Sequence, residues 1–195
     1  MSNTKENRMK MKDIAMIGIF GALLFVITML AGSLMALSMT VQMYSVAIIS
    51  LFSAPLYMLV MAKVRKKGAV IGICALVGIL WVLFGGFFVL IWMIVLGIVG
   101  EILVNRTRYQ SYKALTVSFG LYTVAYYLGA IAPIYYYPAY VYRLGYPAET
   151  SDALIAAAHT PTGYIAIPVT IIAIILGAVI AKALLKKHFE KAGVV

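Results

Sequence analysis

Charge is scarce in this sequence of 195 residues. Aspartate, glutamate, lysine and arginine together make up 11% of the chain, whereas 64% of it is hydrophobic. Soluble domains hold about 25% charged and about 45–50% apolar residues. Because exposing that much apolar surface to water is unfavourable, the composition excludes an ordinary soluble domain. It predicts a single domain, residues 1–195, whose solvent is a lipid bilayer.

The residues that build most reactive centres are also scarce. The chain has one cysteine, Cys74, and two histidines, so an intramolecular disulfide framework is excluded. It contains no GxxxxGK[ST] loop for nucleotide phosphates and no HExxH or paired-cysteine pattern for a metal. We therefore expect no catalytic residue, no metal ligand and no resident cofactor, and no hydrolysis of ATP by the chain itself.

The net charge of +10 does not indicate a nucleic-acid partner. The basic residues form short clusters between apolar runs, rather than a continuous patch or a recognisable nucleic-acid-binding motif. Such spacing is typical of the loops of a membrane protein.

Long uncharged runs are what the sequence does have. They cover residues 14–62, 68–100 and 114–134, and a fourth apolar run, 164–185, contains Lys182 as its one charge. One helix needs about 20 apolar residues to cross a bilayer. The first run has room for two helices. The second has room either for two rather short helices or for one helix and a re-entrant segment. The sequence thus predicts an all-α, polytopic membrane protein: a six-transmembrane-helix bundle with a long outward loop between helices 5 and 6. Its parts are a cytoplasmic arm (1–13), six transmembrane helices (14–185) and a cytoplasmic tail (186–195).

The basic residues also orient the predicted helices. With six spans, fifteen of the 16 lysines and arginines fall in the termini and loops of one side, and Arg143 alone falls on the other. Since lysine and arginine are retained on the cytoplasmic side, both termini are predicted to be cytoplasmic. The loop around Arg143 is then predicted to face outward.

Aromatic residues gather in that outward part. Ten of the 14 tyrosines lie between Tyr122 and Tyr164, and more aromatic residues surround Gly85-Gly86 at another outward turn. Aromatic walls with a few polar groups are typical of small-molecule pockets. The residues predicted to bind a substrate are Trp81, Trp92, Tyr122, Tyr126, Tyr136, Tyr140, Arg143 and His159.

Three polar residues have two interpretations each. Arg143 either pairs with Glu149 or Asp152, or holds an acidic group of the ligand. His159, at the expected start of the last helix, is either structural or a ligand contact. Glu101 either extends to the cytoplasmic interface and pairs with a nearby arginine (Arg106 or Arg108), or is a functional acid within the membrane.

Parts of the sequence resemble a known family. The opening Lys10-Met11-Lys12-Asp13-Ile14, the Gly18-Ile19-Phe20-Gly21-Ala22 that follows it and the closing KKHFEKAGVV are similar to the Trep_Strep family, classed among the S components of energy-coupling factor (ECF) transporters. The resemblance implies a six-helix subunit in the bacterial cell membrane that captures a vitamin-like or other trace nutrient. It also implies a transmembrane coupling subunit and two cytoplasmic ATPases as partners, with Gly18 and Ala22 on the docking face. Taken without the resemblance, this small-residue pair is equally consistent with packing inside the bundle.

Two other classes of function stay open at this point. One is a small integral-membrane enzyme acting on a lipid or cofactor intermediate, for which Arg143, Glu149, Asp152 and His159 are the available groups. The other is a purely structural or assembly subunit. For the transport function, the abundance of tyrosine favours a flat aromatic or tetrapyrrole-like ligand.

Overall fold

The computed structural model describes residues 9–191, without the side chains of residues 188, 189 and 191. The described part is all-helical, with 85% helix and no strand, which confirms the all-α part of the predicted fold class. Residues 1–8 of the predicted arm and 192–195 of the predicted tail lie outside it. The helices are α1 (Met11–Ser33), η1 (Leu34–Ala36), α2 (Met39–Met43), α3 (Ser45–Val64), α4 (Ala69–Val82), α5 (Phe87–Arg106), α6 (Tyr112–Ala130), α7 (Ala132–Tyr136), α8 (Pro138–Tyr142), α9 (Ala148–Ala158) and α10 (Pro161–Lys191).

Five of the described segments are long and apolar enough to cross a bilayer. They are Met11–Ala36, Ser45–Val64, Phe87–Arg106, Tyr112–Tyr136 and Pro161–Lys187. The uncharged run 68–100 forms two helices, as predicted, but α4 has only 14 residues. At 1.5 Å per residue it spans about 21 Å, which is less than the roughly 30 Å of a hydrocarbon core.

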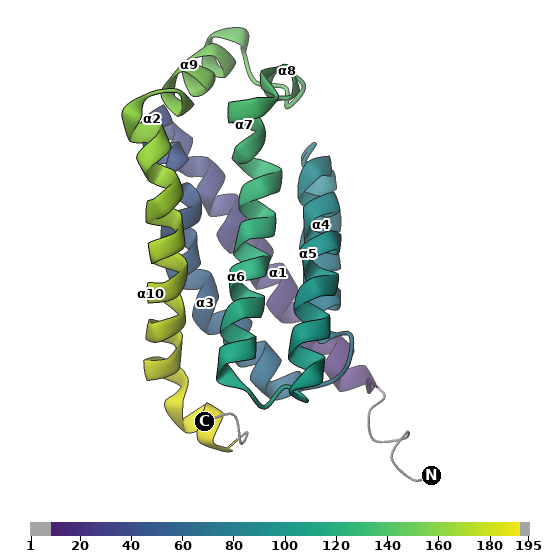
Figure 1. Cartoon of the computed structure of the whole chain (residues 1–195). Coiled ribbons are helices and arrows are strands. Elements are labelled where there is room, and N and C mark those ends of the chain that lie inside the picture. Colours follow the sequence, from purple (N-terminus) through teal and green to yellow (C-terminus); the bar gives the residue numbers. More distant parts are fainter. Residues whose placement is uncertain (1–8, 192–195) are drawn as a thin grey trace.

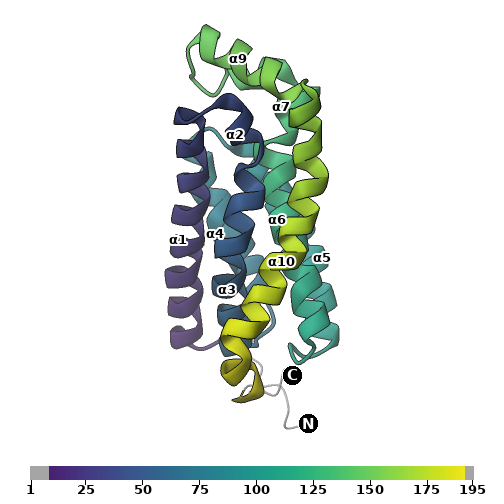
Figure 2. The ribbon, with the colours of Figure 1, turned by 90° about the vertical axis from the view of Figure 1, so that its left-hand side faces the viewer.

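The long helices extend between the two ends of one bundle, with α1 oblique to α10 in the view of Figure 1 (Figures 1 and 2). They are α1, α3, α4, α5, α6 and α10. The start of α1 and the end of α10 lie at the same end of the bundle (Figure 1). We call it the basic end, because the lysines and arginines between α3 and α4, near the α5–α6 turn and late in α10 lie there. The short helices α7, α8 and α9 cover the opposite end, and we call them the cap (Figure 1).

The cap replaces the long loop that the sequence predicted between the last two spans. Two of its prolines explain the difference: Pro138 begins α8 and Pro133 lies in the first turn of α7. Proline in the first helical turn costs no hydrogen bond and presets the backbone, so it starts a helix there. The hydroxyl of Tyr135 donates to the Gly163 carbonyl at 2.8 Å and so ties α7 to α10.

Helix α5 packs closely between α4 and α6 because glycines let the backbones approach. A Cβ on Gly97 would lie 2.9 Å from the Cβ of Cys74 in α4, and one on Gly100 would lie 3.0 Å from Ser118 Oγ in α6. A Cβ on Gly129 of α6 would lie only 2.4 Å from the Val89 Cα atom. In lipid, such close contact replaces the hydrophobic drive of a soluble core.

Candidate functional site

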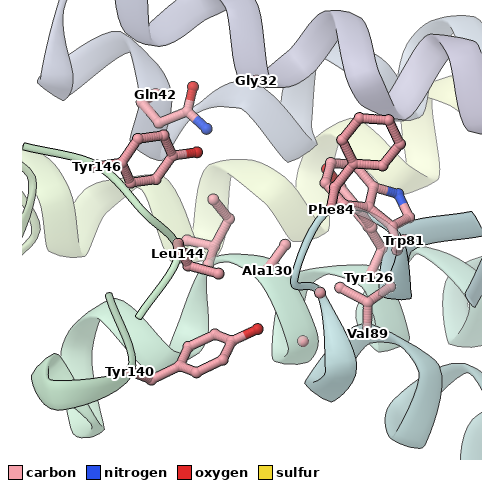
Figure 3. A pocket seen from close by; sticks show the side chains of 13 residues that line it. Gly32, Gln42, Trp81, Phe84, Val89, Tyr126, Ala130, Tyr140, Leu144 and Tyr146 are labelled. Carbon is pink, nitrogen blue, oxygen red and sulfur yellow. The ribbon is translucent and has the colours of Figure 1, made fainter. Parts of the chain in front are cut away.

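A pocket opens between the bundle and its cap (Figure 3). Its cavity volume is about 80 Å³, within about 520 Å³ of empty space that includes open solvent at the mouth. Its wall combines the ends of α1 and α4, the α4–α5 turn, α2, α6, α8 and the turn that follows α8. The lining residues are Gly32, Gln42, Trp81, Phe84, Gly86, Val89, Tyr126, Gly129, Ala130, Ile131, Tyr140, Leu144 and Tyr146.

Thr28 of α1 fixes two aromatic walls of the pocket. Trp81 Nε1 donates to Thr28 Oγ1 at 2.9 Å, and the Tyr126 hydroxyl donates to the Thr28 carbonyl at 3.1 Å. The Trp81 and Tyr126 ring centroids lie 5.5 Å apart. Because their polar atoms are already paired, these two residues present apolar ring surface to the pocket.

A second set of contacts holds the cap against the bundle. The Tyr140 hydroxyl donates to the Gly85 carbonyl at 2.8 Å, which joins α8 to the α4–α5 turn. Gly85 has φ +80°, a left-handed conformation that glycine adopts without strain. Burial raises the pKa of Tyr140, so its phenol stays uncharged at neutral pH.

Gln42 of α2 brings a polar amide to the wall, in addition to the hydroxyl of Tyr146. Its Oε1 atom is buried and has no hydrogen-bond partner in the described part of the chain. A buried acceptor without a partner costs about 1–3 kcal/mol. The amide therefore offers an unused acceptor beside the ring of Tyr146, as Figure 3 shows.

Three of the eight predicted substrate-binding residues line this pocket: Trp81, Tyr126 and Tyr140. They come from α4, α6 and α8, so the fold brings together residues that are up to 59 positions apart. Aromatic residues were predicted to build the wall and do so, but Gln42, Phe84 and Tyr146 were not among the residues predicted to bind a substrate. The aromatic cluster at the Gly85-Gly86 turn was the signal for Phe84.

The other predicted aromatic residues lie outside the pocket wall. Tyr122, one helical turn before Tyr126, is 2% exposed and packs in the core with its ring 5.2 Å from that of Tyr57. Trp92 is partly buried against the core on α5. Tyr136, at the end of α7, is 59% exposed on the outside of the cap.

Arg143 and His159 are exposed on the cap and do not line the pocket either. In the described part of the chain Arg143 forms no ion pair with Glu149 or Asp152. Asp152 instead accepts a hydrogen bond from the Tyr142 hydroxyl, and His159 Nδ1 pairs with the Ile155 carbonyl at 2.8 Å. No three His, Cys, Asp or Glu side chains of the described residues come together as a metal site.

Glu101 has a role at the basic end that its neighbours in the sequence do not suggest. Its carboxylate accepts the N–H groups of Gly68 at 2.7 Å and Val70 at 3.0 Å, and the Tyr109 hydroxyl at 2.5 Å. The predicted pairing with an arginine is therefore wrong. The carboxylate caps the N-terminus of α4, where free N–H groups and the helix dipole favour negative charge.

Tyr109 is built into this cap of α4. The residue is 2% exposed and has a left-handed backbone with φ +59°, a conformation that is costly for a residue with a side chain. Burial and the neighbouring Glu101 carboxylate raise the pKa of the Tyr109 phenol, so it stays a donor. The strained turn positions that donor on Glu101.

The small residues at the start of α1 face outward. A Cβ on Gly18 would meet nothing within 4 Å, and Ala22 is exposed. Packing of this pair inside the bundle, which the sequence left open, is therefore not what the structure shows. Ile19 and Leu23, which follow these two residues in the sequence and lie about 100° further around the helix, are 61% and 45% exposed.

Comparison with models of protein families places the chain in a family of membrane proteins. A family described as hypothetical bacterial integral membrane protein (Trep_Strep) matches residues 11–191. No curated protein and no solved structure shows significant similarity to the chain. The match covers every helix described above.

Proposed function

Because the chain belongs to the Trep_Strep family of bacterial integral membrane proteins, we propose that it is the substrate-binding (S) subunit of an ECF-type importer. It captures a vitamin-like or other trace nutrient from outside the cell and catalyses no reaction itself. A transmembrane coupling subunit and two cytoplasmic ATPases supply the energy for uptake.

The pocket at the end opposite the basic end is the observation that carries this proposal. Lysine and arginine mark the cytoplasmic side of membrane proteins, so the basic end is cytoplasmic and the pocket opens to the outside. A mouth beneath a cap of short helices gives a nutrient access without passage through the bundle. In this orientation both termini lie in the cytoplasm.

Six spans are part of the proposal. Helix α4, with 14 residues, crosses as the short third span. A helix end within lipid needs partners for its free N–H groups, since water is not there to provide them. Glu101 supplies these partners, which supports a short span rather than a surface helix.

The outward face of α1 is the proposed docking surface for the coupling subunit. We expect Ala22→Trp to reduce co-purification of the coupling subunit and ATPases at least tenfold, because an indole prevents the close approach that small residues allow. The measurement is affinity purification of the tagged protein from its host, with the partners identified by mass spectrometry.

The matched control is Leu23→Trp on the same helix. Leu23 is exposed but is rotated by about 100° from Ala22 around the helix axis, so the indole points toward lipid beside the docking face. Equal loss of partners in both variants, or no loss in either, would contradict the proposed docking role of Gly18 and Ala22. Recovery of no ATPase with the wild-type protein would contradict the proposed function itself.

A further inference from the structure

The chemistry of the pocket wall narrows the class of ligand, and this inference rests on the proposed function. We propose that the pocket takes an uncharged, planar aromatic ligand that donates an N–H or O–H hydrogen bond to Gln42 Oε1. We expect charged acids and amines built on the same aromatic rings to bind more weakly than the uncharged ligand. The predicted contact between Arg143 and an acidic group is not part of this mode of binding.

Charge is the first argument. None of the residues that line the pocket is Asp, Glu, Lys, Arg or His. Arg143, the cation nearest to it in the sequence, is exposed at the end of α8 and lies outside the wall. An ion that enters a largely apolar site loses its hydration and finds no opposite charge there, so the neutral form of a ligand is favoured.

Ring shape is the second argument. Trp81, Phe84 and Tyr126 form one side of the pocket, and Tyr140 and Tyr146 line it from the cap (Figure 3). Aromatic side chains bind flat rings by stacking and by edge contacts. Since the cavity volume is only about 80 Å³, the pocket suits a small ring system better than a tetrapyrrole.

The hydrogen-bonding state of the wall is the third argument. The side-chain donors of Trp81 and Tyr126 already bond to Thr28, and the hydroxyl of Tyr140 bonds to the Gly85 carbonyl. Gln42 Oε1, by contrast, is buried without a partner in the described part of the chain. A ligand with an N–H or O–H donor gains a hydrogen bond to this acceptor, which is unpaired in the free protein, whereas a ligand without a donor leaves it as it was.

Three probes with one ring system separate these requirements. They are 2-naphthamide, which is neutral and has an N–H donor; methyl 2-naphthoate, which is neutral without a donor; and 2-naphthoate, which is an anion. Binding is measured by calorimetry on protein in lipid nanodiscs whose native mass spectrum shows no bound molecule. Empty nanodiscs correct for partition of the probes into lipid.

We expect 2-naphthamide to bind about tenfold more tightly than the ester and about 100-fold more tightly than the anion. In Gln42→Leu the advantage of the amide over the ester should disappear, while the ester keeps its affinity. Equal or tighter binding of 2-naphthoate, an amide advantage that persists in Gln42→Leu, or binding of none of the three overturns the inference.

Two variants that fill the pocket show where the probes bind. Ala130→Trp places an indole on the α6 wall, and Leu144→Trp places one on the turn after α8. Folding of both is checked by circular dichroism. If the probes bind but a folded variant binds them as well as the wild type does, the pocket is not the binding site and the proposed function loses its support. If filling abolishes binding while the anion is preferred, only the ligand class is wrong.

Discussion

Gly129→Ala is expected to destabilise the bundle by about 3 kcal/mol or more. The added Cβ would lie 2.4 Å from Val89 Cα and 2.6 Å from Val89 N, both of which are backbone atoms of α5. A backbone cannot rotate away as a side chain can, so α5 and α6 must separate. Because Gly129 and Val89 also line the pocket, this separation should remove probe binding as well. The measurement is reversible unfolding in bicelles.

Gly120→Ala is the matched control, since Gly120 lies on the same helix. A Cβ there would meet Ile174 Cγ2 at 3.7 Å, an ordinary van der Waals contact. We expect this variant to change stability by less than about 1 kcal/mol, because the higher helix propensity of alanine stabilises α6 and offsets a small packing cost. Similar stabilities for the two variants would show that the α5–α6 contact is looser than the structure has it.

Glu101→Leu should cost roughly 3–5 kcal/mol of stability, because it leaves several buried donors without an acceptor at once. They are the N–H groups of Gly68, Val70 and Ile71 and the hydroxyl of Tyr109. Helix α4 should lose its first turn, and with it the geometry that places Trp81 at the far end of the same helix in the pocket. Unfolding in bicelles and amide hydrogen exchange of residues 68–72 measure the two effects.

Two further variants separate capping from ion pairing. Tyr109→Phe removes one of the four donors and should cost about 1–2 kcal/mol. Arg106→Ala should change stability by less than about 0.5 kcal/mol, since the exposed arginine is not the partner of Glu101. A large loss in Arg106→Ala together with a small one in Glu101→Leu would restore the ion-pair interpretation.

The long helices follow from the sequence because lipid allows little else. Uncharged runs bounded by lysine and arginine predicted the all-α bundle, and residues 68–100 predicted two short helices where α4 and α5 lie. The cap could not be read in the same way. Prolines near residues 133, 138 and 161 resemble loop signals, and only the structure shows that they occupy the first turns of helices.

The aromatic character of the pocket wall could be predicted from the sequence, but the set of residues that lines the pocket could not. Helical spacing directs both Tyr122 and Tyr126 inward, yet the position of Thr28 and of the α4–α5 turn decides that Tyr126 lines the pocket while Tyr122 lies in the core. Arg143 and His159 were predicted to bind substrate because of their side-chain chemistry. The sequence does not indicate that the cap directs these side chains away from the pocket. Glu101 meets residues 30–33 positions away, a contact that charge patterning cannot reveal.

Capture of a small molecule in the pocket beneath the cap is the central claim, and native mass spectrometry of protein purified from its own host membranes tests it most directly. The account predicts a bound, uncharged small molecule on the wild-type protein that is absent from folded Ala130→Trp. A wild-type protein that never carries such a mass, or the same mass on both proteins, would contradict it.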